Sequence, residues 1–133
     1  MNTSKLRSGV RFTLAALFVV AGVLHFTHTK FYVAIVPSVL PYPHALVIIS
    51  GVCEIIGGAA LLVPRLRRPA SYGLIALLLA VFPANIGMAI GDAQTAATTF
   101  PPLLLWLRLP LQFVLIAIVW WCARADAGAV KNR

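Results

Sequence analysis

Acidic residues are the scarcest feature of this sequence. Its 133 residues include only three aspartates and glutamates, and charged residues make up 11% of the chain. Soluble domains usually contain about 25% charged and about 45–50% apolar residues, whereas 61% of this chain is hydrophobic. So few polar residues cannot cover the core of a water-soluble domain. The composition therefore excludes an ordinary soluble domain and indicates a protein whose surface mostly faces lipid.

Cysteine is also rare, and its placement argues against two kinds of site. Cys53 and Cys122 are the only thiols and form no Cys-x-x-Cys pair, so a self-contained dithiol redox centre is not supported. His25 and His28 have no nearby carboxylate or thiol in the sequence and make a poor metal site. We therefore predict no bound metal. The sequence leaves open whether the chain is an enzyme.

Basic residues outnumber acidic ones and give a formal net charge of +8. They form short clusters beside apolar runs, not a stripe along one amphipathic face, so we predict no nucleic-acid partner. Lysine and arginine placed in this way are typical of the signal that orients helices in a membrane.

Four apolar stretches cover residues 10–28, 45–63, 69–91 and 103–123. Each is close to the ~20 residues that cross ~30 Å of hydrocarbon as a helix. We therefore predict an all-α fold: a four-helix transmembrane bundle that forms a single domain over residues 1–133. The chain's main partner is then the lipid bilayer.

Two connections between these stretches are distinctive. Residues 30–43 are too apolar for a solvated loop, and three prolines prevent one continuous helix. We predict a short interfacial or re-entrant element there, between the first two helices. A polar, threonine-rich stretch from Gly91 ends in Pro101–Pro102, which suits the start of the last helix.

The lysines and arginines also predict the orientation of the bundle. Nine lie at the end that carries both termini and two at the other end, so both termini are expected in the cytoplasm. The nine are Lys5, Arg7, Arg11, Arg65, Arg67, Arg68, Arg124, Lys131 and Arg133; the two are Lys30 and Arg108. Phe31, Tyr32, Tyr42 and Trp106 are expected to form an outer aromatic belt. A cleaved signal peptide ending near Ala21 is a second interpretation, but the apolar run continues to Phe26 and favours a span.

Five polar side chains lie inside the predicted spans, where burial in lipid is costly. At ~1.5 Å per residue they all fall roughly 6–14 Å below the outer helix ends. The five are His25, Glu54, Asn85, Arg108 and Gln112. All four helices thus contribute to one polar cluster in the outer half, which we predict to be a ligand-binding site. The inner half is expected to be plain hydrocarbon with an arginine collar.

Helical spacing predicts where the carboxylate points. Glu54 shares a helix face with glycines in the segment at 51–58, and small faces pack against other helices in membranes. Glu54 should therefore point into the bundle. Ser50 lies one turn earlier on the same stripe, and His28 shares a face with His25, so both are secondary members of the site.

Two interpretations of the cluster remain open. In the first it is a self-satisfied network, with Glu54 paired with Arg108 or protonated His25, and with Asn85 and Gln112 closing the remaining hydrogen bonds. In the second it is a pocket, open to the outer leaflet, that binds a polar headgroup.

Six short motifs, in this order, are similar to those of one family. They are GVLHF at 22–26, the Pro37/Pro41 loop, SGVCEIIGG at 50–58, PRLRR at 64–68, VFPAN at 81–85 and RLPLQ at 108–112. The sequence resembles the DoxX-like membrane proteins, which are sometimes grouped with the MauE proteins of methylamine utilisation. The resemblance implies a four-helix protein of the bacterial cytoplasmic membrane, with His25, Glu54, Asn85 and Gln112 at motif positions.

The resemblance also implies a function class. Some members are similar to subunits of quinone-linked thiosulfate oxidation, and others are associated with thiol stress or quinone resistance. The resemblance therefore implies a quinone as a possible ligand and a membrane or soluble redox protein as a possible partner. It implies no required cofactor. A large soluble domain found in some relatives' systems is absent.

Two functions of other classes compete with this hypothesis. A small proton-coupled transporter would also carry one membrane carboxylate, although four-helix multidrug exporters place it in the first helix. A structural membrane scaffold would use the cluster only to join helices. Gly87 and Gly91 could face a second copy in a homo-oligomer or another helix of the same chain.

Overall fold

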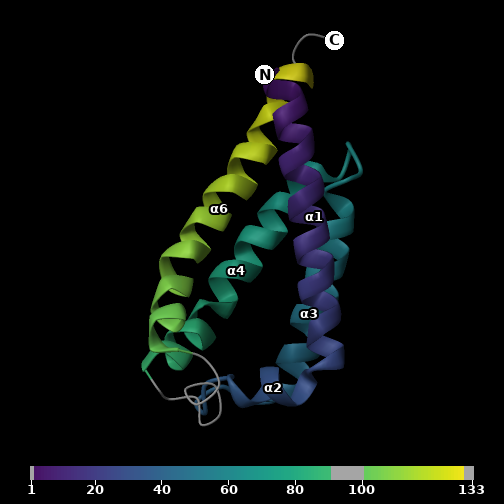
Figure 1. The fold of residues 1–133 in the computed structure, drawn as a ribbon. Coiled ribbons are helices and arrows are strands. Elements are labelled where there is room, and N and C mark those ends of the chain that lie inside the picture. Colours follow the sequence, from purple (N-terminus) through teal and green to yellow (C-terminus); the bar gives the residue numbers. More distant parts are fainter. Residues whose placement is uncertain (1, 91–100, 131–133) are drawn as a thin grey trace.

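The computed structural model describes residues 2–90 and 101–130, with side chains described as far as residue 124. These residues form α1 (Thr3–Thr27), α2 (Thr29–Ala34), α3 (Pro43–Ala60), α4 (Arg67–Ile90) and α6 (Pro102–Val130) (Figure 1). All but α2 are long and apolar enough to cross a membrane. The prediction of an all-α four-helix bundle is confirmed, and the chain is a multi-pass membrane protein.

The four long helices are arranged as two pairs. Helix α1 packs along α3 and α4 packs along α6, while α3 and α4 join the pairs. Helices α1 and α6 make few contacts; they come together near the chain termini and separate toward α2 (Figure 1). An apolar cluster that includes Leu14, Phe18, Leu74 and Val119 fills the interior between the pairs.

Glycines allow the close approach of α1 and α3. A Cβ atom at Gly22 would lie 2.6 Å from the carbonyl oxygen of Gly51, and one at Gly51 would lie 2.8 Å from the Cβ of His25. Gly51, Glu54 and Gly58 are all buried on one face of α3. The prediction that Glu54 points into the bundle from a small-residue face is therefore confirmed.

This close approach predicts a large difference between two Gly→Ala variants. Gly22→Ala is expected to lower the free energy of unfolding by about 1–2 kcal/mol, because the new methyl group must push α1 away from the α3 backbone. Gly73→Ala is the control: its Cβ would meet nothing within 4 Å, and alanine favours the helix by roughly 0.5–1 kcal/mol. Thermal unfolding in detergent measures both. Equal stability of the two variants would contradict the close approach.

The segment between α1 and α3 contains the expected short element, the six-residue helix α2. It lies across the end of the bundle far from the termini (Figure 1). Tyr42, in the left-handed region with φ of 55°, ends the segment, and Pro43 is the first residue of α3. The location of α2 at a membrane interface stays a prediction.

Three helix boundaries differ clearly from the prediction, and one of them is the end of α6, which extends to Val130 and not to residue 123. Helix α1 begins at Thr3, not near residue 10, because the side chain of Asn2 caps it by accepting a hydrogen bond from the backbone N–H of Ser4. Helix α3 ends at Ala60, and turns follow. Helix α6 begins at Pro102 as expected, while residues 91–100 of the polar connection lie outside the described residues.

The end of the bundle that carries the termini is more polar than expected. Arg11 on α1 and Ser71 on α4 are buried, with 8% and 1% of their surface exposed. Arg11 belongs to the predicted arginine collar, whereas the burial of Ser71 at this end was not predicted. The arginine collar itself is present, and it packs on aromatic rings: the Arg7 guanidinium lies 5.0 Å from the centre of the Trp121 ring.

Candidate functional site

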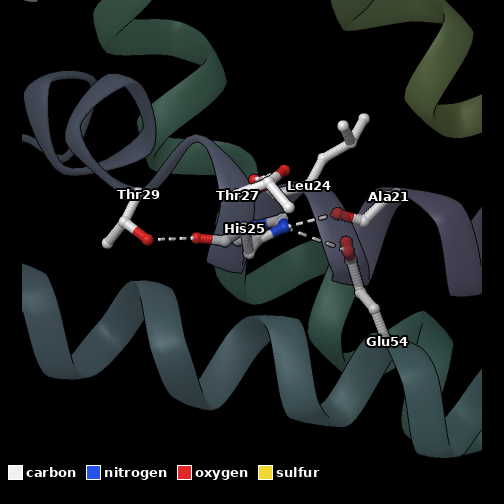
Figure 2. Close-up of polar contacts among 6 residues, drawn as sticks. All are labelled: Ala21, Leu24, His25, Thr27, Thr29 and Glu54. Atoms are coloured by element: carbon white, nitrogen blue, oxygen red, sulfur yellow. Dashed lines mark hydrogen bonds and ion pairs between the residues drawn. The ribbon is translucent and has the colours of Figure 1, made fainter.

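His25 and Glu54 join α1 to α3 at the heart of the site (Figure 2). The Nδ1 atom of His25 lies 2.8 Å from the carbonyl oxygen of Ala21 and 3.4 Å from Oε2 of Glu54. A carbonyl oxygen can only accept, so Nδ1 must carry the proton and donate it. In the neutral ring, Nε2 is then the acceptor.

The Glu54 carboxylate is held near His25 but is not satisfied. Its Oε2 atom is buried and accepts no hydrogen bond from any residue that the structure describes, since the contact with His25 has the distance of an ion pair but not the geometry of a hydrogen bond. A buried acceptor without a donor is costly and calls for an explanation.

Tyr32 of α2 covers the other side of His25. The two rings stack, with centroids 4.0 Å apart and planes inclined by 22°. Burial raises the pKa of the Tyr32 phenol and the nearby Glu54 carboxylate raises it further, while Arg108 lowers it. The phenol therefore remains protonated, and Tyr32 borders the site. Sequence reasoning missed it because the chain turns at His28, between the two stacked residues. The membership of Tyr32 in an outer aromatic belt stays a prediction.

Asn85 and Gln112 form a second polar pair, which joins α4 to α6. Asn85 Nδ2 donates to Gln112 Oε1, and Gln112 Nε2 donates to the backbone carbonyl of Leu78. Both side chains are buried. This pair therefore satisfies its own groups across the helix contact, as the network interpretation expects, whereas the Glu54 carboxylate does not.

Arg108 is the cation of the site and does not pair with Glu54. Among the described residues no carboxylate lies within ion-pair distance of its guanidinium, which lies 3.8 Å from the sulfur of Met88 through Nη1. Its side chain is exposed at the bundle surface. Of the two partners that the sequence left open for Glu54, the structure has His25.

Two adjoining cavities bring the predicted residues together. The first, about 310 Å³, lies under α2; its polar walls are His25, Tyr32, Ser50, Glu54, Asn85 and Arg108. The second, about 460 Å³, lies between α1 and α6 and is bordered by Glu54, Asn85, Arg108 and Gln112. His28 borders neither cavity. It is exposed at the end of α1, where its Nδ1 lies 2.8 Å from the Thr27 hydroxyl.

The same helices carry the family match. A family model described as a domain of unknown function, DUF8561, matches residues 14–123. The chain belongs to the DUF8561 family. No curated protein and no solved structure gives a significant match to it.

The walls of the first cavity define what this DUF8561 protein can hold. They combine a carboxyl group, a donor-only guanidinium and a tyrosine hydroxyl with apolar residues such as Ile35 and Val47. Such a mixture places polar donors and acceptors beside apolar walls. Within the described residues no three histidine, cysteine, aspartate or glutamate side chains are placed to hold a metal.

Proposed function

We propose that this DUF8561 protein binds the head of a quinol, or of a similar amphiphile, in the cavity beneath α2. The observation that carries the proposal is the buried Oε2 of Glu54, which lacks a donor among the described residues and borders this cavity. Arg108 borders the same cavity and can only donate. A head that carries both a hydroxyl and a second oxygen suits this combination, because it donates to Glu54 and accepts from Arg108.

The other walls support this role. The hydrogen bond from His25 to Ala21 fixes the ring beside Glu54, and the stacked Tyr32 covers that ring. The carboxylate is therefore oriented before a ligand arrives, which lowers the entropy cost of binding. Ser50 adds a small hydroxyl to the same wall.

The redox setting of the proposal comes from the resemblance to DoxX-like proteins. That resemblance supports an accessory or subunit role in quinone-linked or thiol redox chemistry. In this role the chain binds the quinol and a membrane or soluble partner protein carries out electron transfer. The cavity supplies positioning and hydrogen bonds, both of which the described side chains can provide.

The topology belongs to the same proposal. With both termini in the cytoplasm, the nine lysines and arginines lie inside, and α2 with the cavity beneath it lies in the outer half of the membrane. The resemblance supports the bacterial cytoplasmic membrane as the location. A cysteine introduced at Ser38, in the segment between α2 and α3, should then react with an impermeant thiol reagent added outside intact cells.

Quinol binding is tested with decyl-ubiquinol and decyl-ubiquinone added to the protein in lipid nanodiscs. We expect saturable binding of the quinol, measured as an increase in thermal stability. Glu54→Gln should weaken it about tenfold, because the amide replaces a charged acceptor by a neutral one, a difference of about 1.4 kcal/mol. The oxidised quinone has no hydroxyl to donate, so its affinity should change less than twofold.

Val20→Ala, on the lipid-facing side of α1, is the control for a substitution outside the binding site. It should bind both forms as the parent protein does. If neither form raises the thermal stability of the parent protein, the proposal is wrong, and a structural scaffold becomes the better account of the cluster.

A further inference from the structure

The first cavity, which we call the head site, opens into the second cavity, and the walls of the two cavities differ in polarity. The two cavities share Glu54, Asn85 and Arg108, so polar groups mark the junction between them. Beyond that junction the second cavity is mainly apolar; its walls include Leu14, Leu17, Phe18 and Ala21 of α1 and Leu111 and Leu115 of α6. A polar chamber is thus followed by an apolar groove.

The groove lies where the bundle is least closed. Helices α1 and α6 make few contacts and separate toward α2 (Figure 1). Leu17 on one side of the groove is 55% exposed, and Leu111 on the other side is 56% exposed. Both helices are long and apolar enough to span the membrane. The groove therefore opens toward lipid.

We propose that the ligand enters sideways from the bilayer and that its apolar tail lies between α1 and α6. This inference rests on the proposed function, because it gives a path to the tail of the amphiphile whose head binds under α2. It narrows the ligands to tailed amphiphiles that reach the site through lipid. Arg108 stands at the junction, where its guanidinium holds an oxygen of the head while the tail passes into the groove.

The groove acts through shape. Lipid tails are as apolar as leucine, so an apolar wall offers a tail no hydrophobic gain over the bilayer. Its contribution is the space that it leaves beside the head site. A bulky side chain in that space should therefore exclude a tailed ligand and spare a head without a tail.

A second groove offers another route for a tail. It runs between α3 and α4, includes Ala76, and meets the first cavity at Ala80. It shares none of the polar residues of the head site. The α1–α6 groove is the better path because Glu54 and Arg108 border both this groove and the first cavity.

The test compares three tryptophan variants with two probes in nanodiscs under reducing conditions. The probes are decyl-ubiquinol and the same quinol head without a tail, with concentrations expressed per lipid because the tailed probe partitions into the bilayer. Leu17→Trp fills the α1–α6 groove. Val20→Trp is the matched control on the same helix, since Val20 is 57% exposed but does not line the groove. Ala76→Trp fills the α3–α4 groove.

We expect Leu17→Trp to weaken decyl-ubiquinol about tenfold and the tail-less quinol less than twofold, with both probes unchanged in the other two variants. Leu111→Trp fills the groove from α6 and should repeat the result if Leu17→Trp does not fold. Equal weakening of both probes, or selective weakening by Ala76→Trp, would overturn the path. If the tail-less quinol binds and depends on Glu54 but no groove variant affects the tailed one, the proposed function stands and this inference fails alone.

Discussion

Replacing Arg108 with leucine is expected to weaken the binding of both decyl-ubiquinol and decyl-ubiquinone by about thirty- to a hundredfold. A hydrogen bond to a charged group contributes about 1.5–3 kcal/mol, and each 1.4 kcal/mol is a factor of ten. Arg108 borders both cavities, and among the described residues it forms no ion pair that would compete for its guanidinium. Both redox forms carry an oxygen that accepts from it, so both should lose affinity. Thermal shift in nanodiscs measures the change.

Arg108→Lys separates charge from shape. Lysine keeps the charge but offers a single donor point instead of a planar fork, so we expect about a tenfold loss. The comparison of the two variants is the most informative result. Arg108→Leu should lower the affinity for both redox forms, whereas Glu54→Gln should lower the affinity for the quinol alone. If Arg108→Leu leaves the affinity for both forms unchanged, the guanidinium takes no part in binding the head, and Arg108 is a residue that contacts lipid.

The fold was predictable because bilayer thickness sets the length of the spans. Apolar runs of about 20 residues separated by prolines and arginines leave few alternatives to four crossing helices. The inward direction of Glu54 was predictable for a similar reason. Glycines on its face identify the side of α3 on which another helix can approach, and Gly51 and Gly58 lie on that side in the structure.

The partners inside the site were less predictable. Depth along a helix places His25, Glu54 and Arg108 at a similar level, but it does not say which helices touch. That depends on the crossing at Gly22 and Gly51, which brings α1 against α3 and leaves α6 apart. Tyr32 reaches His25 because the chain breaks at His28 and α2 turns across the bundle end, a change of direction that no residue spacing encodes.

The two polar pairs have different roles in the same bundle. Asn85 and Gln112 satisfy each other and a backbone carbonyl, so they hold α4 against α6 whether or not a ligand is present. His25 Nδ1 lies 3.4 Å from Oε2 of Glu54 without hydrogen-bonding to it, so this oxygen has no donor among the described residues. Asn85 and Gln112 thus supply partners for each other, whereas Glu54 Oε2 has none among the described residues, and for this reason we propose the ligand-binding role for the α1–α3 pair.

The His25–Glu54 pair should therefore show strong coupling in a double-mutant cycle. His25→Leu is expected to lower the free energy of unfolding by about 3 kcal/mol, because it leaves the buried carboxyl group without its neighbouring N–H. Glu54→Leu should cost less, since the His25 N–H keeps the Ala21 carbonyl as a partner. The double variant His25→Leu/Glu54→Leu should recover at least 1 kcal/mol relative to the sum of the single variants.

The cycle distinguishes a real pair from two residues that are merely close together. Thermal or denaturant unfolding in the same detergent gives all four free energies. The glycines through which α1 and α3 approach each other are unchanged in every variant, so a general loosening of α1 from α3 would appear in each single variant and add without coupling. Additive costs would show that Glu54 is held by its helix alone. A coupling of the expected sign would show that His25 orients the Glu54 carboxylate. The double variant lacks this carboxylate, so it should not bind the quinol even where its stability is restored.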